Sequence, residues 1–149
     1  MKIINLPKFS SEIEIVSFQV NGEEIKVNYF PDGVQAGFPS PADDFKEEKL
    51  SLDKKYLTNP DATYIVKVKG NSMFPTLEIS DLLIVKSDLR MEDNDIVIVS
   101  VNNTEFTVKR FDKSNNILLA DNPEFSNIEI QEEDTLICLG VVKNLIRDI

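Results

Sequence analysis

Apolar and polar residues alternate in short runs along most of this chain, and a period of two is typical of β-strands with one buried face. After Asn59-Pro60 these runs follow one another closely and are separated by turn residues. They predict strands at residues 63–68, 82–86, 95–101, 105–111, 116–120 and 135–145. Asn102-Asn103 lies between two of them and favours a tight hairpin, because asparagine tolerates positive φ. We expect a mainly β fold, a strongly curved and mostly antiparallel sheet or partly open barrel.

The first third of the chain shows the same alternation around a different turn. Two alternating runs flank Asn21-Gly22, a pair that suits a type I′ turn, so residues 13–30 are predicted to form a β-hairpin. Prolines and glycines recur over residues 31–44, which excludes a persistent helix or central strand and indicates an extended, accessible loop. Over residues 46–57, Ser51 is a candidate N-cap for a short helix.

Composition narrows the class of protein. The 149 residues, 42% of them hydrophobic, suffice for one compact domain with a short appendage. The net charge of -10, from 26 acidic and 16 basic residues, disfavours direct binding of nucleic acid. No run approaches the roughly 18 apolar residues of a membrane span, and no signal-peptide core is visible, so we expect a soluble, cytoplasmic protein without a membrane partner. Cys138 lies in an apolar run and is expected to be buried.

Candidate chemistry comes from a serine and a lysine in a chain that contains no histidine. If Ser72, in Gly70-Asn71-Ser72-Met73, is a nucleophile, the usual remaining base is a neutral lysine amine, and Lys109 is the candidate. A lysine in water has a pKa of about 10.4, so Lys109 must be buried, without a carboxylate partner, to be neutral near pH 7. The alternatives are an ordinary solvent-facing strand lysine and a serine that only caps a helix. Neither a metal ion nor a cofactor is expected.

Ser72 follows a predicted strand and the flexible Gly70, an arrangement that can project its hydroxyl from a strand-to-helix turn. Backbone N–H groups surround a side chain in such a turn. The N–H groups of Asn71 and Ser72 are therefore candidates for an oxyanion hole, where each donor contributes roughly 3 kcal/mol.

Several blocks of sequence, in the same order, resemble the LexA and UmuD family of self-cleaving serine-lysine peptidases, and its UmuD-like members in particular. The blocks are Val34-Gln35-Ala36-Gly37-Phe38-Pro39-Ser40-Pro41-Ala42-Asp43-Asp44, Gly70-Asn71-Ser72-Met73, Asp81-Leu82-Leu83-Ile84-Val85 and Phe106-Thr107-Val108-Lys109. The resemblance implies self-cleavage between Ala36 and Gly37, with Ser72 as nucleophile, Lys109 as general base and the backbone of Asn71 and Ser72 as oxyanion hole.

The resemblance also implies a domain organisation and partners. Residues 1–36 would be an extended N-terminal arm that cleavage removes, residues 37–60 a linker, and residues 61–149 a peptidase domain of the LexA and UmuD C-terminal type. Cleavage would be stimulated by RecA on single-stranded DNA, in the response to DNA damage. The cleaved homodimer would then serve as accessory subunit of an error-prone translesion DNA polymerase.

Three other functions remain open from the sequence. A LexA-type repressor would share Ser72, Lys109 and the Ala36–Gly37 bond, but it requires a helix-turn-helix domain, and the residues before Gly37 are predicted to be strands. A type I signal peptidase would share the serine-lysine pair but would need a membrane anchor. A non-cleaving dimeric scaffold would bind a polymerase without cutting itself.

Overall fold

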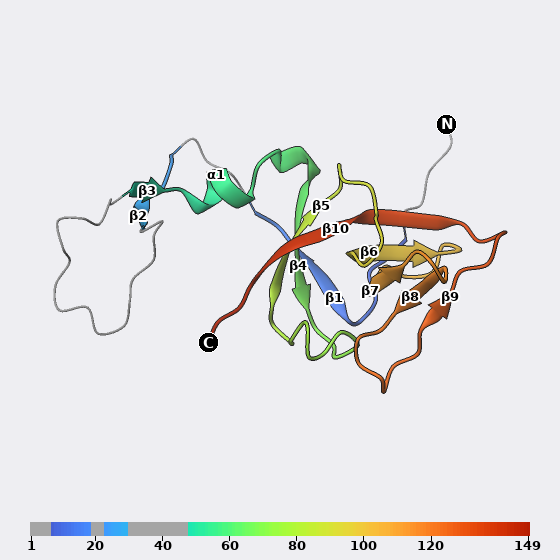
Figure 1. Cartoon of the computed structure of the whole chain (residues 1–149). Helices are drawn as coiled ribbons and strands as arrows, with labels where there is room; N and C mark the ends of the chain where they lie inside the picture. The colour runs from blue at the N-terminus through green and yellow to red at the C-terminus, as the bar shows by residue number, and fades with distance from the viewer. Residues whose placement is uncertain (1–6, 19–22, 30–47) are drawn as a thin grey trace. The chain divides into compact units, whose positions relative to one another are not determined.

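A computed structural model of the chain describes residues 7–18, 23–29 and 48–149 (Figure 1). The described residues belong to two compact units. The larger unit comprises Met1–Phe18 and Asn59–Ile149, and the smaller comprises Gln19–Thr58. Each unit is described by itself below.

The larger unit is built on an eight-stranded antiparallel sheet that curls into a half-barrel (Figure 1). This confirms the mainly β, strongly curved fold that the alternation predicts. Along the sheet the strands are β1 (Ile13–Val16), β4 (Thr63–Val68), β5 (Leu82–Lys86), β10 (Leu136–Ile146), β6 (Ile96–Val101), β7 (Thr107–Asp112), β8 (Ile117–Leu119) and β9 (Ile128–Glu129).

Six of these strands, β4 to β8 and β10, lie where the alternation predicts them, with ends that differ by at most a few residues. The short strand β9 was not predicted. The turn between β6 and β7 is as expected: Asn102 and Asn103 both have positive φ, at 52° and 59°, and the N–H of Thr104 donates to the carbonyl of Val101 at 3.0 Å. A tight turn of this hand matches the twist of the strands that it joins.

Apolar side chains are buried on both faces of the central strand β6. Ile98 belongs to one hydrophobic cluster, whereas Val97 and Val99 belong to another. Neighbouring residues of a strand point to opposite faces, so the two clusters lie on the two sides of the sheet. The first cluster contains Val66, Met73, Leu77 and Val108, and it therefore supports the segments that carry the candidate site.

The predicted hairpin over residues 13–30 is wrong. β1 pairs with β4, in a register that places Ile13 opposite Val68 and Val16 opposite Ile65, whereas β2 (Val27–Tyr29) pairs with β3 (Glu48–Leu50). The alternating run shows that residues 13–16 form a strand, but a period of two carries no information about the partner strand. Burial of Ile13, which is 3% exposed, in the first hydrophobic cluster favours the pairing with β4.

The strand β10 contains a β-bulge, where its register against β6 shifts between Cys138 and Gly140. Cys138 is exposed, so the expectation that it is buried is wrong. The prediction rested on the apolar run alone. Ile137 and Leu139 pack against the first hydrophobic cluster, and Cys138 between them points to the opposite face of the strand.

In the smaller unit, the helix α1 spans Leu52–Tyr56, and the Ser51 hydroxyl accepts a hydrogen bond from the N–H of Lys54 at 3.4 Å. The short capped helix predicted in this region is confirmed. In the larger unit a 3₁₀ turn, η1 (Pro60–Ala62), precedes β4.

The predicted loop and the Ala36–Gly37 bond lie outside the described residues. Among the residues that the structure describes, no helix is long and apolar enough to cross a membrane.

Candidate active site

Ser72 lies in an irregular series of turns that follows β4. Its neighbour Met73 is buried in the first hydrophobic cluster together with Leu77, and the N–H of Leu77 donates to the carbonyl of Met73 at 2.9 Å. These contacts anchor the turn that carries the serine. Residues 72–76 form turns and no helix, so the prediction that a helix follows this turn is wrong. Ser72 is 1% exposed.

Lys109 projects from the middle of β7 into the interior of the larger unit. Its side chain is 7% exposed, and its amine donates to the Thr107 hydroxyl at 2.9 Å and to the Val108 carbonyl at 3.2 Å. The alternative of a solvent-facing strand lysine is therefore wrong.

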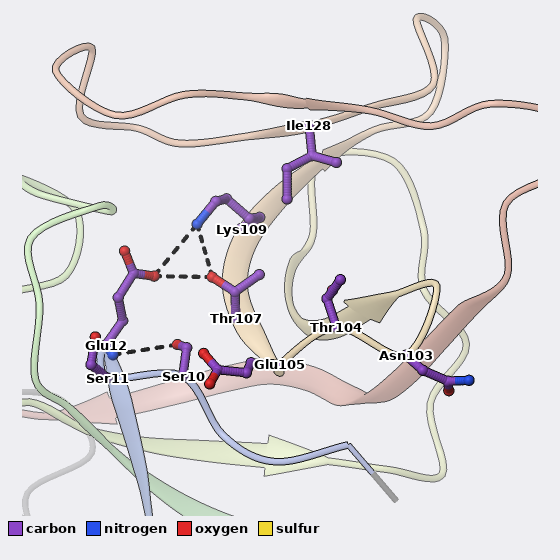
Figure 2. Close-up of a pocket in the computed structure, with 9 residues that line it drawn as sticks. All are labelled: Ser10, Ser11, Glu12, Asn103, Thr104, Glu105, Thr107, Lys109 and Ile128. Carbon is purple, nitrogen blue, oxygen red and sulfur yellow. Dashed lines mark hydrogen bonds and ion pairs between the residues drawn. The ribbon is translucent and has the colours of Figure 1, made fainter.

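Glu12, from the segment before β1, brings the two candidate residues together. Its Oε2 atom accepts a hydrogen bond from the Ser72 hydroxyl at 3.1 Å and lies 3.5 Å from the Lys109 amine. The same oxygen also accepts a hydrogen bond from the Thr107 hydroxyl at 3.0 Å. Figure 2 shows the Glu12 carboxylate pointing toward Lys109 and Thr107. The expectation that Lys109 has no carboxylate partner is wrong.

Burial and Glu12 act on the Lys109 amine in opposite directions. Burial, the larger effect, lowers the pKa of Lys109 below its usual value, because the charged form loses its hydration. The negative charge of Glu12 and its hydrogen bond raise the same pKa. The net shift is downward, the direction that a lysine base requires.

An open cleft of about 640 Å³ runs beside this pair of residues. Side chains from the arm, from the turn before β7, from β7 itself and from β9 line it: Ser10, Ser11, Glu12, Asn103, Thr104, Glu105, Thr107, Lys109 and Ile128 (Figure 2). The lining includes Lys109 but not Ser72, which contacts Glu12 instead. The cleft therefore reaches the candidate base and not the candidate nucleophile.

Asn122 holds the backbone of the serine turn. Its side-chain amide donates to the carbonyl of Asn71 at 2.9 Å, and its backbone N–H donates to the carbonyl of Ser72 at 3.0 Å. Because a trans peptide unit directs its C=O and N–H in opposite directions, the N–H of Ser72 points away from Asn122. Asn122 is buried and so forms a rigid support for both candidate oxyanion residues.

Arg110 connects this support to the strand that carries Lys109. The Arg110 guanidinium donates to both oxygens of Asp121, at 2.9 and 2.7 Å, and the Thr76 hydroxyl donates to Asp121 at 2.6 Å. Asp121 thereby links β7 to the turns after Ser72. Its hydrogen bond with the Arg110 guanidinium lowers the pKa of the Asp121 carboxyl, which favours the ionised form.

Two side chains of the site were not identified from the sequence. Asn122 was recognised only as part of the turn Asp121-Asn122-Pro123, and a polar residue in a turn has no distinctive spacing from a distant serine. Nothing in the sequence around Glu12 points to the site, because its contact with Ser72 joins residues 60 positions apart. Among the described residues, no group of three or more histidine, cysteine, aspartate or glutamate side chains is arranged to hold a metal ion.

Comparison with known proteins relates the chain to one family of peptidases. The family model for Peptidase S24-like proteins matches residues 28–143. Protein ImpA of Salmonella typhimurium is 37% identical over 122 residues, which cover 78% of this chain and 81% of the relative. The LexA repressor of Acidithiobacillus ferrooxidans is 38% identical over 120 residues, covering 76% of this chain and 58% of the relative.

Protein MucA of Escherichia coli is 35% identical over 85 residues, which cover 56% of this chain and 58% of the relative. These similarities agree with the motifs around Ser72 and Lys109 and indicate a serine peptidase. The chain belongs to the Peptidase S24-like family, as a UmuD-like member of the LexA and UmuD group.

Proposed function

We propose that this protein is a self-cleaving serine peptidase, in which Ser72 is the nucleophile, Lys109 is the general base and the Ala36–Gly37 bond is the substrate. The observation that supports it most directly is that the Ser72 hydroxyl and the Lys109 amine, both on buried side chains, lie within 3.5 Å of the same carboxylate oxygen. A hydroxyl and a shielded amine close to each other are the two groups that this chemistry needs.

The reaction follows from these two groups. Neutral Lys109 accepts the Ser72 proton as Oγ bonds to the carbonyl carbon of Ala36. The tetrahedral intermediate collapses, the bond to the Gly37 nitrogen breaks, and the Lys109 ammonium returns its proton to the departing amine. Water, deprotonated by the neutral lysine, then hydrolyses the ester and releases the Ala36 carboxylate and the free Ser72 hydroxyl. Because enzyme and substrate share one chain or one dimer, the attack is effectively unimolecular.

The negative oxygen of the intermediate requires donors near Ser72. The backbone N–H groups of Asn71 and Ser72 are proposed for this role. The hydrogen bond from the Asn122 amide to the Asn71 carbonyl supports it, since this bond sets the orientation of the peptide unit that contains the Ser72 N–H.

The UmuD-like character of the chain suggests its setting in the cell. We place the protein in the cytoplasm, in the bacterial response to DNA damage, as a homodimer whose cleavage is stimulated by RecA on single-stranded DNA. The cleaved form is proposed to bind the catalytic subunit of an error-prone translesion polymerase. A net charge of -10 agrees with recognition of RecA, rather than of the DNA itself.

Incubation with RecA, single-stranded DNA and a nucleoside triphosphate, followed by intact mass measurement, tests the proposal. The expected products are one fragment that ends at Ala36 and one that begins at Gly37. Ser72→Ala should remain whole, and so should Lys109→Ala near neutral pH. Two exposed residues provide matched controls, and Ser114→Ala and Lys143→Ala should cleave like the wild type.

Two results would contradict the proposal. Cleavage of Ser72→Ala at the wild-type rate would exclude this serine as the nucleophile. A wild-type chain that binds the polymerase subunit and stays whole under every activating condition would identify the protein as a non-cleaving scaffold.

A further inference from the structure

The N-terminal arm lies along the candidate active site, with a turn at Ser11 and Glu12 between the residues that bond to Phe106 and the strand β1. At one end, the N–H of Ser10 donates to the carbonyl of Phe106 at 3.0 Å, and the N–H of Phe106 donates to the carbonyl of Lys8 at 2.7 Å. Phe106 comes directly before β7, the strand that carries Lys109. The rings of Phe9 and Phe106 are 5.4 Å apart, which adds an aromatic contact to these two backbone bonds.

At its other end the arm pairs with the segment that leads to Ser72. The carbonyl of Glu12 accepts hydrogen bonds from the N–H groups of Lys69, at 2.6 Å, and Gly70, at 3.2 Å. Beyond Glu12 the arm continues as β1, paired with β4 and anchored by the buried Ile13. Residues 8–16 therefore contact both of the elements that carry the candidate nucleophile and the candidate base.

The fit at Gly70 is close. A Cβ atom at this position would lie 3.1 Å from Cγ of Glu12 and 3.3 Å from its Cα. Only glycine leaves the backbone of Glu12 enough room to accept both hydrogen bonds without a shift. The backbone at Lys69 and Gly70 thus accommodates Glu12 at the place where its side chain reaches Ser72.

We propose that residues 8–16 are an inhibitory segment bound in the peptide groove of the peptidase, with the Glu12 carboxylate in the space that a scissile peptide group must enter between Ser72 and Lys109. This inference rests on the function proposed above and adds a regulated step to it. The surface involved is the groove between the end of β4 and the start of β7, and its occupant is the chain's own arm.

Hydrogen bonding around Glu12 favours the inactive, protonated form of the candidate base, against the larger effect of burial. The Lys109 amine faces three acceptors, on Thr107, Val108 and Glu12. An ammonium group has three N–H donors and satisfies all three, whereas a neutral amine has two donors and a lone pair. The carboxylate charge beside the amine also favours the ammonium form.

Glu12 also redirects the proton of the candidate nucleophile. The Ser72 hydroxyl donates to the Glu12 carboxylate rather than to Lys109. Since Ser72 is 1% exposed, a peptide carbonyl cannot approach its Oγ atom while Glu12 stays in place. The inhibitory segment must leave before any substrate binds, so a partner that binds the released arm would accelerate cleavage.

Self-cleavage of the full-length chain without an activator, measured by intact mass at one alkaline pH, tests this inference. The variants are Glu12→Ala, which removes the carboxylate, and Glu12→Gln, which keeps its size and removes its charge. Glu14→Ala is the matched control, because Glu14 lies two residues further along the arm and forms an exposed ion pair with Lys69, away from Ser72. Amide hydrogen exchange at Lys69 and Gly70 reports independently whether Glu12 is bound, since both N–H groups donate to its carbonyl.

We expect Glu12→Ala to cleave roughly tenfold faster than the wild type or more, because the variant loses one charged hydrogen bond that holds the inhibitory segment in place. Exchange at Lys69 and Gly70 should accelerate in parallel. Glu12→Gln should change both quantities in the same direction and by less, and it controls for a folding defect of the alanine variant. Glu14→Ala should stay within about twofold of the wild type, as is usual for an exposed ion pair.

Faster amide exchange with unchanged or slower cleavage in Glu12→Ala would overturn the inference, because the inhibitory segment would then be released without activating the enzyme. Unchanged exchange in both Glu12 variants would overturn it as well. If no chain cleaves even with RecA present, the proposed function fails. Amide exchange at Lys69 and Gly70 then decides separately whether Glu12 holds the inhibitory segment in the groove. Faster exchange in the Glu12 variants supports this binding, and unchanged exchange rejects it.

Discussion

The backbone N–H of Asn122 donates a hydrogen bond to the carbonyl of Ser72 at 3.0 Å, while the Asn122 side chain binds the carbonyl of Asn71. One buried residue therefore controls two successive peptide units of the serine turn. Asp121, its neighbour in the chain, is bound by Arg110 of β7. The relative position of Ser72 and Lys109 thus depends on this two-residue loop and not on the β-sheet alone.

Substitution of Asn122 tests this support. Asn122→Asp keeps the shape of the side chain but removes the N–H donor to the Asn71 carbonyl, so the serine turn should lose its fixed orientation. We expect self-cleavage to slow by roughly 10- to 100-fold, the usual effect of a misplacement of about 1 Å at a reacting group. The rate is measured by intact mass with RecA present.

Asn122 acts by positioning, so the midpoint of the pH–rate profile in Asn122→Asp should equal that of the wild type while the maximal rate falls. A thermal unfolding midpoint within a few degrees of the wild type would show that the fold is retained. An unchanged cleavage rate would show that the serine turn needs no such support.

The pH dependence of cleavage should respond to Glu12. Cleavage without an activator should rise with pH as Lys109 loses its proton, because only the neutral amine accepts the Ser72 proton. Glu12 raises the pKa of Lys109, whereas burial lowers it. Glu12→Gln removes the raising effect, so the midpoint of the pH–rate profile should move to lower pH.

The second acidic residue that lines the cleft, Glu105, is present in both chains and does not contribute to this difference. Glu14→Gln serves as control and should leave the midpoint where it is. A midpoint that moves upward, or a rate independent of pH, would contradict the assignment of Lys109 as the base.

Gly140 should tolerate no larger residue. A Cβ atom there would lie 2.6 Å from the carbonyl oxygen of Lys86 and 2.8 Å from its carbonyl carbon, both backbone atoms of the paired strand β5. Gly140→Ala should lower the free energy of unfolding by roughly 2 kcal/mol, within the range for overpacking in a core. Urea unfolding measures the change. Cys138→Ala, at an exposed position of the same strand, should stay within about 0.5 kcal/mol of the wild type.

Asp81 should contribute stability that depends on pH. Its carboxylate is 1% exposed and accepts two hydrogen bonds from Arg147, both at 2.7 Å, and one from the N–H of Glu78 at 2.8 Å. Arg147 lowers the pKa of Asp81 from its ordinary value of 3.8. The stabilisation is therefore fully present above that ordinary value and is lost as the pH falls through the lower, folded-state pKa.

Asp81→Asn should cost about 2 to 3 kcal/mol at pH 7, as for loss of a buried charged hydrogen bond. Urea unfolding at several pH values should show this difference shrinking below about pH 4. The exposed substitution Asp61→Asn should cost little at pH 7. A constant difference between wild type and Asp81→Asn at all pH values would mean that the ion pair is not the source of the stability.

Most strands of the larger unit could be predicted because each is a local pattern, and the short strand β9 is the exception. The alternating run at residues 63–68 specifies a strand with one buried face, and Asn102-Asn103 specifies the turn between β6 and β7 through its tolerance of positive φ. The candidate pair Ser72 and Lys109 could be named without the fold, because a chain without histidine has few other bases. Their roles remain predictions, and so do those of Asn71 and of the Ala36–Gly37 bond.

Partners across the sheet could not be predicted in the same way. An alternating run such as residues 13–16 pairs equally well with any strand of suitable length, and only burial of Ile13 in the common core selects β4 over β2. The apolar run around Cys138 misled for a related reason, since such a run does not specify which of its side chains the folded core covers: Ile137 and Leu139 pack against it, and Cys138 is exposed.

The amino-acid order alone determines the β class and most strand positions, because each depends on residues close together in the chain. The proposal of serine-lysine chemistry also comes from the sequence, because it depends on a residue type that is missing. Tertiary structure alone decides that Glu12 lies between Ser72 and Lys109 and that Asn122 supports the serine turn. These contacts join segments far apart in sequence, and their formation depends on the burial energy of the whole core rather than on any local preference.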